Sequence, residues 1–492
     1  MKSLGLYING HYVQTPEHFL ANNPTGLAFA PIELATIHSS DEDSEIVEAA
    51  LQGAHETFAQ IQAGFFPLHE RLSFLRKLET KLAEQSENMA SLMMREIGKP
   101  IKLCRQEILR AQQTLTHTIR VAAEFFNAQG LPLAATSGFE TYRGFVTREP
   151  RGPLLAITPF NYPLNLVMHK LAPAIAAGCP VILKPSPKSQ LVALTLVDFC
   201  HACELPPGML NLLQCDNALT EKLIKDPRVE QFSFTGSAQV GWHLASLDVK
   251  PFTLELGGNT PVYVDQSAPL ELAAQKVVQG AFSYAGQICI SIQNIDVHKQ
   301  VASEFKKLLQ KEIEKFAWGN PEQEIVLSGP VIEEAAATRL KTLRDGLLSC
   351  GAKSVGVSQN KHFPGINAQA TSQYLCPEIF ENIPLSDAIY REEIFGPYAS
   401  FNVVDCFSSW KKRVNEQKFR LQAGVFAHDK NILIEAARDL RFGGILLNES
   451  PTTRFDPMLY GGRGQSGRGR EGARYALEEF TEYKAVIEKL DS

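Results

Sequence analysis

One cysteine and one glutamate occupy places where each could do covalent chemistry. Cys289 lies in AGQICISIQN (285–294), between a Gly-Gln turn and a short apolar run, and Glu255 lies inside the apolar segment LELGGN (254–259). A thiolate is the effective nucleophile, and because a free cysteine has a pKa of about 8.5 it needs local help. A buried carboxylate has a raised pKa, which suits a general base. The alternatives are an inert core thiol and a structural glutamate with its own partner.

Two further segments place a polar side chain directly after an apolar, strand-like run. TPFNYPLN (158–165) carries Asn161 in a turn bracketed by prolines, and VILKPSPKS (181–189) carries Lys184. The Asn161 amide could donate to a developing oxyanion, which contributes about 10²–10³ in rate when preorganised, or it could cap the next helix. Lys184 could meet a ligand in the crevice beside a parallel sheet, or it could stay solvated.

The segment VEQFSFTGSAQVG (229–241) predicts a strand that ends at Gly236 and a helix with Ser237 as its N-cap. A helix N-terminus beside the carboxyl end of a strand binds anions such as dinucleotide phosphates. The glycine spacing, Gly236-x-x-x-x-Gly241, differs from the GxGxxG fingerprint. An ordinary strand-to-helix turn is therefore the alternative.

The other cysteines are scattered, and only Cys200 and Cys203 have a CxxC spacing. Because no second ligand pair follows, neither redox chemistry nor zinc binding is predicted for them, and no metal site is expected. The total of nine is odd, which favours reduced thiols in a cytosolic protein. A Cys-His hydrolase is not indicated, because no histidine stands close to Cys289 in the sequence.

Size and composition indicate an ordinary multidomain globular protein. The chain has 492 residues, of which 44% are hydrophobic and 21% charged, and its formal net charge is −6. A mildly acidic chain without a basic block is not typical of nucleic-acid binders. The start, MKSLGLYING, lacks the apolar core of a secretory signal, and no apolar run reaches the length of about 18 residues that a membrane span needs. A cytoplasmic protein without membrane or nucleic-acid partners is expected.

The elements that must position these side chains follow from the pattern of apolar residues. Residues 42–126 repeat them at helical spacing, and from residue 144 short strand-like runs alternate with amphipathic segments, which predicts a parallel sheet. A second alternating pattern begins after residue 257. TSGFETYRGFVTRE (136–149) predicts a hairpin that leaves the body, with EFTEYKAVI (479–487) as a partner strand. The fold class predicted is therefore α/β, with two α/β domains and a small β extension.

Seven motifs together resemble those of the aldehyde dehydrogenase superfamily, in the same order. They are TPFNYP, LKPS, FTGSAQVG, LELGGN, GQIC, EEIFGP and YGGRGQSGRGRE. The resemblance extends from INGHYV near the N-terminus to EEFTEYKAVI at the end. Glu255 and Cys289 are 34 residues apart, as in the hydrolytic members of that superfamily.

The resemblance implies a fold with three parts. A Rossmann-like cofactor domain would comprise residues 1–125 and 148–256, and an α/β catalytic domain residues 257–455. A β arm of residues 126–147 and 470–492 would join subunits into a homodimer or homotetramer.

The resemblance also implies a mechanism that uses NAD or NADP. Cys289 would attack an aldehyde, Asn161 and the Cys289 backbone N–H would hold the oxyanion, and Glu255 would activate the water that hydrolyses the thioester. Lys184 and Glu393 would hold the two riboses. The full set of residues implied for the cofactor site is Ile157, Pro159, Phe160, Lys184, Ser186, Gly236, Ser237, Val240, Leu256, Gly257, Glu393 and Phe395.

Two departures from the family pattern bear on specificity. NAD-preferring members often carry a glutamate where this chain has Pro187, followed by Lys188, so we expect NADP+ at least to be tolerated. Members that oxidise phosphorylated aldehydes tend to carry arginine before the nucleophile, and Ile288 stands there. This predicts a small uncharged or hydroxylated aldehyde, lactaldehyde-like first and succinate semialdehyde second. His169 and Arg454 are either pocket residues or structural ones.

In the family motif near the C-terminus a lysine usually stands where this chain has Gly464, and we assign no ligand to that segment.

Rival function classes would require different residues in the sequence. An acylating dehydrogenase generally lacks the general base, whereas Glu255 is present. A non-catalytic binding or structural relative would be expected to have lost Cys289, Glu255 or Asn161, and all three remain.

Overall fold

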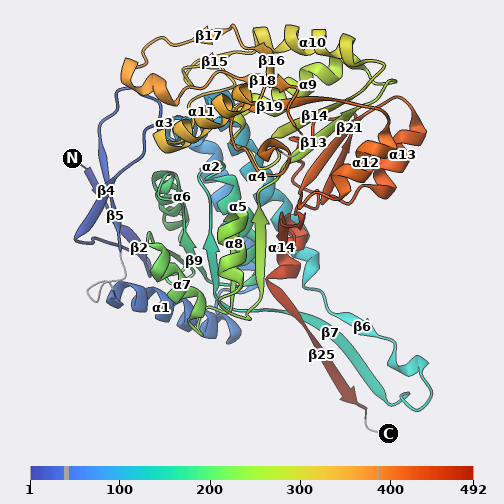
Figure 1. Ribbon diagram of the computed structural model, residues 1–492. Helices are drawn as coiled ribbons and strands as arrows, with labels where there is room; N and C mark the ends of the chain where they lie inside the picture. The colour runs from blue at the N-terminus through green and yellow to red at the C-terminus, as the bar shows by residue number, and fades with distance from the viewer. Residues whose placement is uncertain (1, 38–43, 385–386, 491–492) are drawn as a thin grey trace.

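Two mostly parallel sheets form the body of the protein in the computed structural model, which describes residues 2–37, 44–384 and 387–490 (Figure 1). In the first sheet, β12, β11, β8, β9 and β10 are parallel, and β24 and β2 pair with its two ends in antiparallel fashion. In spatial order its strands are β24 (Gly467–Arg468), β12 (Phe252–Leu256), β11 (Gln231–Gly236), β8 (Leu154–Ile157), β9 (Val181–Lys184), β10 (Leu210–Leu212), β2 (Leu6–Ile8) and β3 (His11–Val13).

The second sheet has seven strands and begins after the LELGGN segment. Neighbouring strands within this sheet run parallel to each other, except that β16 and β18 run antiparallel. Its strands, in spatial order, are β16 (Lys353–Val357), β18 (Glu378–Glu381), β19 (Tyr398–Val404), β14 (Ile292–His298), β13 (Thr260–Val264), β21 (Gln422–Phe426) and β22 (Gly444–Leu447). The α/β class predicted from alternating patterns is confirmed. The predicted domain boundary after residue 256 falls between β12 and β13, which belong to different sheets.

In the described part of the chain, four α-helices lie between β5 (Ile32–Thr36) and the arm, in the region where helical spacing predicted them. They are α1 (Ser44–Gln62), α2 (Leu68–Glu84), α3 (Ser86–Ile97) and α4 (Ile101–Phe125). The buried side chains of α4 recur three and four residues apart, including Cys104, Ile108, Ala111 and Leu115, which places one face of the helix against the body. None of the helices in the described part of the chain combines the length and apolar character that crossing a membrane requires.

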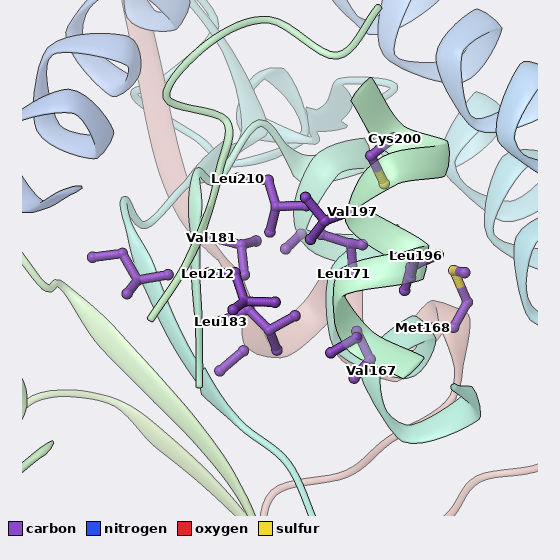
Figure 2. Close-up of a cluster of buried hydrophobic side chains, with 14 of the residues drawn as sticks. Val167, Met168, Leu171, Val181, Leu183, Leu196, Val197, Cys200, Leu210 and Leu212 are labelled. Atoms are coloured by element: carbon purple, nitrogen blue, oxygen red, sulfur yellow. The ribbon is translucent and has the colours of Figure 1, made fainter. Parts of the chain in front are cut away.

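Helix α5 (Asn165–Ala177) lies at the centre of the first core, and every one of its residues is buried. It packs with α6 (Gln190–Ala202) against β9 and β10, where Val167, Leu171, Leu183 and Val197 lie together (Figure 2). Full burial of one such aliphatic side chain contributes about 1.5–3 kcal/mol. Cys200 of the CxxC pair lies in this cluster, and both cysteines of the pair are buried free thiols.

A three-stranded arm extends away from the body (Figure 1). It consists of β6 (Gln129–Leu131), β7 (Tyr142–Pro150) and β25 (Thr481–Lys489), with β7 in the middle. The predicted partner strand is confirmed, because β25 pairs with β7 along its whole length.

The hairpin predicted within residues 136–149 is wrong in its bounds. The hairpin partner of β7 is β6, which lies before that segment, and residues 136–141 form no strand. The reason is local. Gly138 has φ +89°, and its N–H donates to the Glu140 carboxylate at 2.9 Å, so the chain turns there. At the other end, α14 (Ala473–Glu479) packs into the first core through Ala476 and Leu477.

Candidate active site

The carboxyl ends of four parallel strands meet at one edge of the first sheet. Ile157 at the end of β8 pairs with Lys184 at the end of β9 and with Phe234 on β11, while Thr235 pairs with Glu255 on β12. In open α/β sheets, ligands bind in the crevice outside such strand ends.

A cavity of about 390 Å³ opens at this edge and reaches the loop that carries Cys289. Ile288 also lines this cavity. The prediction of an uncharged aldehyde rests on the apolar side chain of this residue. The predicted site residues in its lining are Pro159, Phe160, Asn161, Gly236, Ser237, Glu255, Leu256, Gly257, Cys289, Glu393 and Phe395. The predicted residues outside its lining are Ile157, Lys184, Ser186 and Val240, whose cofactor role stays a prediction.

Cys289 lies on a loop with unusual backbone geometry. The preceding residues Tyr284, Ala285 and Gly286 all have positive φ, at 51°, 52° and 66°. A Cβ on Gly286 would lie 2.1 Å from the carbonyl oxygen of Gly396, so only glycine fits there. Such consecutive left-handed residues persist only where the surrounding structure fixes them, as at functional sites.

The Cys289 thiol contacts one hydroxyl. Its Sγ lies 3.0 Å from the Oη of Tyr460. Burial raises the pKa of Cys289 to about 12, and the hydrogen bond with Tyr460 acts in the opposite direction. Burial thus favours the protonated thiol, and ionisation of Cys289 needs local help.

Asn161 is joined to the same loop. Its Nδ2 donates to the carbonyl oxygen of Gln287 at 2.9 Å, two residues before the cysteine. The alternative role as a helix cap is not observed, because α5 begins at Asn165 and is capped by the carboxylate of Glu107. That carboxylate accepts the N–H groups of Leu164 and Asn165, both at 3.0 Å.

A buried ion pair stabilises the turn that contains Asn161. Lys99 pairs with Glu107, and its Nζ also donates to the Asn161 carbonyl oxygen at 3.1 Å. The same ammonium lies 3.4 Å from the centre of the Tyr162 ring. Because both charges are buried and matched, the pair fixes the turn between β8 and α5 in one geometry.

Glu255 is a buried carboxyl group that faces the cavity. Only 3% of the residue is exposed, and neither carboxylate oxygen has a hydrogen-bond partner within the described protein. Burial raises the pKa of Glu255 well above its usual range, and the nearby Glu471 carboxylate raises it further. A carboxylate with a raised pKa is a stronger base once it has lost its proton.

The strand-edge part of the cavity has the features of a dinucleotide cradle. Ser237 caps α8 (Ala238–Ala245) by accepting the Val240 N–H at 3.4 Å, which confirms the predicted N-cap. A Cβ on Gly257 would lie 2.2 Å from the Glu393 carboxylate, so the glycine lets that carboxylate approach the backbone. Burial raises the pKa of Glu393 to about 7, although the Gly258 N–H, which it accepts at 3.3 Å, acts the other way.

An aromatic pair closes the cradle. The rings of Phe160 and Phe395 meet edge to face with their centres 6.0 Å apart, and Phe395 has φ +49°. Lys188, which follows the end of β9, forms an ion pair, because its Nζ lies 2.7 Å from the Glu333 carboxylate. The helix N-terminus, the buried carboxylate and this apolar pair fit the phosphate, ribose and ring of a nicotinamide dinucleotide.

Comparison with known proteins agrees with this geometry. Residues 29–486 match the aldehyde dehydrogenase family over nearly the whole chain. The chain belongs to the aldehyde dehydrogenase family. It is therefore an oxidoreductase, and the predicted resemblance is confirmed.

Two relatives of this aldehyde dehydrogenase are named for lactaldehyde or 3-sulfolactaldehyde. A 3-sulfolactaldehyde dehydrogenase from Priestia aryabhattai is 34% identical over 490 residues, which cover 99% of this chain and 98% of the relative. A lactaldehyde dehydrogenase from Methanococcus maripaludis is 32% identical over 462 residues, covering 93% and 94%.

Two solved structures share its fold. Aldehyde dehydrogenase 21 from Physcomitrella patens, solved in complex with the reaction product succinate, has a TM-score of 0.91 and 29% identity and covers 99% of this chain and 98% of its own. The NADP-dependent glyceraldehyde-3-phosphate dehydrogenase from Bacillus halodurans, complexed with NADP, has a TM-score of 0.91 and 28% identity and covers 100% of both chains.

The cavity of this aldehyde dehydrogenase also contains residues that sequence reasoning missed. Arg110 and Tyr460 line it beside Arg454, whereas His169 lies outside the lining. A signal for Arg110 was present, because Glu107, Arg110 and Thr114 recur three and four residues apart, and Glu107 and Thr114 lie on the largely apolar buried face of α4. Nothing in the sequence singled out Tyr460. Among the described residues, no cluster of three or more His, Cys, Asp or Glu side chains could hold a metal ion.

Proposed function

We propose that this aldehyde dehydrogenase oxidises a short hydroxylated aldehyde to the carboxylic acid with NAD+ or NADP+, by way of a thioester on Cys289. The observation that carries the proposal is the single cavity whose lining joins Cys289, Glu255 and Asn161 to the strand-edge cradle. Homologues that act on lactaldehyde and 3-sulfolactaldehyde support the substrate class, since both aldehydes carry a 2-hydroxyl group.

The first step is attack of the Cys289 sulfur on the aldehyde carbon, which forms a C–S bond and a thiohemiacetal oxyanion. The Asn161 amide and the Cys289 backbone N–H donate to that oxygen. Donors fixed before the reaction in this way contribute about 10²–10³ in rate each. The Lys99–Glu107 pair holds the Asn161 turn and so keeps the amide in place.

Bound NAD(P)+ would supply the acceptor for the hydride of the thiohemiacetal carbon, and a thioester on Cys289 would remain. Ser237 and the start of α8 would hold its phosphates, and Glu393 and Lys184 its riboses. The remaining thioester is hydrolysed when Glu255 accepts a proton from water, the hydroxide adds to the acyl carbon, and the Cys289 thiolate leaves. The balance is one aldehyde, one NAD(P)+ and one water converted to one acid, one NAD(P)H and one additional proton.

Succinate semialdehyde is the second candidate substrate, because the fold relative with a TM-score of 0.91 holds succinate as its reaction product. Tolerance of NADP+ follows from the lack of a carboxylate at Pro187, although Lys188 is held by Glu333. We further propose that the enzyme is cytoplasmic and works as a homodimer or homotetramer through its β arm.

A transient kinetic experiment tests the function. Mixing the enzyme with aldehyde and NAD(P)+ is expected to give a burst of one NAD(P)H per subunit and an acyl adduct on Cys289, detectable by mass spectrometry. Glu255→Gln should keep the burst and lose turnover by about 10²–10⁴, whereas Cys289→Ser should lose both. Full dehydrogenase activity in Cys289→Ser would overturn the assignment, and an NAD+ preference above about a hundredfold would overturn the expectation for NADP+.

A further inference from the structure

Two amide side chains bind the same two backbone carbonyls of the loop of residues 389–396, which we call the Glu393 loop. The Asn259 Nδ2 donates to the carbonyl oxygen of Ile389 at 3.0 Å and to that of Glu392 at 2.8 Å. The Gln293 Nε2 donates to the same two oxygens at 2.7 Å and 2.6 Å. Both amides are buried, and all their N–H groups are used on this loop.

Gln293 also binds the loop on the other side of Glu393. Its Oε1 accepts the N–H of Ile394 at 2.9 Å, while its Nε2 binds the Glu392 carbonyl. One side chain therefore bonds both peptide groups that flank Glu393. The carboxylate of Glu393 in turn accepts the N–H of Gly258 at 3.3 Å. Gln293 and this N–H together hold the carboxylate in one place.

The Glu393 loop needs such anchors because its backbone is strained. Phe395 has φ +49°, in the left-handed region that a bulky side chain rarely adopts. Such a conformation costs about 1–3 kcal/mol and persists only where the surroundings fix it. From α11 (Glu334–Ser349), the Arg339 Nη2 donates to the Ile394 carbonyl at 2.8 Å. The residue before Phe395 is thus bonded through both its N–H and its carbonyl.

The two amides stand the same number of residues after the two catalytic candidates. Asn259 lies four residues after Glu255, and Gln293 lies four residues after Cys289. Asn259 directly precedes β13, and Gln293 lies on the neighbouring parallel strand β14. The Glu393 loop is therefore joined to both catalytic segments where they enter the second sheet.

We propose that Gln293 and Asn259 are positioning residues for hydride transfer, because their amides fix the Glu393 loop relative to Cys289. This inference rests on the proposed function and deepens it. Hydride transfer requires the carbon on Cys289 and the nicotinamide ring to be held at one distance, and an error of about 1 Å costs about 10² in rate. The loop would hold the cofactor on its side of that gap, so the two amides set the gap without touching either reactant.

Two reactions at Cys289 differ in their need for this loop. Oxidation of an aldehyde needs the cofactor, whereas hydrolysis of an activated ester such as p-nitrophenyl acetate does not. The Cys289 sulfur would attack the acyl carbon of the ester, and p-nitrophenolate would leave. Water that has given a proton to Glu255 would then hydrolyse the acetyl thioester to acetate and release the thiolate. No hydride is transferred, so the ester reports on the nucleophile and the base alone.

A methionine in place of Gln293 tests the inference, because it removes the amide and keeps about the same length. We expect the rate constant of the NAD(P)H burst to fall about 10–100-fold in Gln293→Met, while hydrolysis of p-nitrophenyl acetate changes by less than about threefold. An unchanged burst, or equal losses in both reactions, would overturn the positioning role.

Gln422→Met is the matched control for this variant. Gln422 is buried on β21 of the same sheet, and its amide has no hydrogen-bond partner among the described residues. The chemical change is therefore the same, but no contact with the Glu393 loop is lost. Its burst should stay within about threefold of that of the unchanged enzyme. A loss as large as that in Gln293→Met would contradict the assignment to the loop.

Two further variants keep the inference testable if Gln293→Met does not fold. Asn259→Leu leaves Gln293 on both carbonyl oxygens, and Arg339→Met removes only the bond to Ile394 from an exposed position. Because each change leaves other anchors in place, each should slow the burst by about threefold to tenfold and spare ester hydrolysis. A burst unchanged in both variants would contradict the inference.

Two measurements need no turnover. Without cofactor, hydrogen exchange in a peptide that contains residues 389–396 should be about tenfold faster in Gln293→Met, because the Ile394 N–H loses its acceptor. Binding of NADH or NADPH, followed by the fluorescence of the reduced nicotinamide, should weaken by about tenfold in the same variant. Exchange and affinity equal to those of the unchanged enzyme would overturn the anchoring of the loop.

These readouts separate the inference from the proposed function. If the unchanged enzyme oxidises no aldehyde, but Gln293→Met exchanges faster and binds the reduced cofactor more weakly, the reaction is wrong and the anchoring of the loop stands. If aldehydes are oxidised through Cys289 and Gln293→Met keeps the burst of the unchanged enzyme, the reaction stands and the positioning role is wrong.

Discussion

At the scale of single residues, the active site combines a thiol that resists ionisation with the groups that promote it. Burial raises the pKa of Cys289 to about 12, and the Tyr460 hydroxyl, 3.0 Å from Sγ, is the direct polar contact that opposes this. Burial raises the pKa of Tyr460 itself well above the usual range, so this hydroxyl keeps its proton and can donate to a thiolate. Tyr460 is thus a positioning and ionisation aid for the nucleophile.

Replacing Tyr460 by Phe tests this role. Without the donated hydrogen bond the thiolate is less stable, so the pKa of Cys289 rises and the acid limb of the kcat/KM profile moves to higher pH, by about one unit for a bond worth about 1.4 kcal/mol. Activity at pH 7 should fall about tenfold and recover at high pH. Tyr475→Phe, outside the cavity lining, serves as the control. A uniform loss at every pH would instead indicate a packing role only.

Glu255 links function to stability, because an unpartnered buried carboxyl favours its protonated form. Between the ordinary glutamate pKa of about 4.3 and the raised native value, the folded protein holds a proton that the unfolded chain has released. The free energy of unfolding therefore falls as pH rises through this range. Glu255→Gln removes the titration, so the variant should be more stable than the unchanged enzyme at pH 8, by about 1–3 kcal/mol, but not at pH 4.5. Urea unfolding at both pH values measures this, and equal differences at the two would contradict it.

At the scale of elements, two helices of the first hydrophobic core, α5 and α6, begin at carboxyl groups supplied by other helices. Glu107 on α4 accepts the N–H groups that start α5, and Glu96 on α3 accepts those of Leu191 and Val192 at the start of α6. A carboxylate at a helix N-terminus satisfies free N–H groups and interacts favourably with the helix dipole. Glu107 also pairs with Lys99, whose Nζ donates to the Asn161 carbonyl oxygen, so Glu107 helps to set the position of Asn161.

Breaking the Glu107 contacts should therefore lower both stability and catalysis. Glu107→Gln leaves the buried Lys99 charge without its partner, which costs about 3–5 kcal/mol of unfolding free energy. It also loosens the Asn161 turn, so kcat should fall more than KM rises. The double variant Lys99→Met, Glu107→Leu removes both charges and should regain most of the stability but not the activity. Recovery of activity together with stability would show that the pair acts on folding alone.

Much of this element structure was predictable, because strands and caps depend on neighbouring residues. The alternating runs at 231–236 and 252–256 and the Ser237 cap required only local pattern and turn chemistry. The arm hairpin was placed wrongly, since the turn at Gly138 interrupts an apparently strand-like segment. The shared position of Arg110 and Arg454 in the cavity lining could not be predicted, because the two residues are far apart in the sequence and only the folded chain brings them to one cavity.

At the scale of the whole molecule, the arm presents an open strand edge. β25 is the outer strand of its sheet, and the N–H of Leu490 and the O of Phe480 bond toward the β7 side. Because antiparallel pairs alternate, even-numbered residues of β25 direct their backbone groups to β7, and odd-numbered residues direct theirs outward. Tyr483 and Ile487 on this strand are 65% and 51% exposed. An open edge with exposed apolar side chains favours pairing with another copy of the chain.

A proline at an outward position tests whether this edge joins subunits. Ala485→Pro removes an N–H that points away from β7, so pairing within the arm keeps its bonds while a second chain loses one. We expect light scattering to show a shift from the oligomer toward a smaller species at micromolar concentration, with the thermal unfolding transition of the body retained. Ala485→Val keeps the N–H and should preserve the oligomer. If the proline variant keeps the mass of the unchanged enzyme, the subunits associate through another surface. Because the Cys289 cavity is lined by residues of the body alone, the smaller species should still show the NAD(P)H burst, which separates assembly from catalysis.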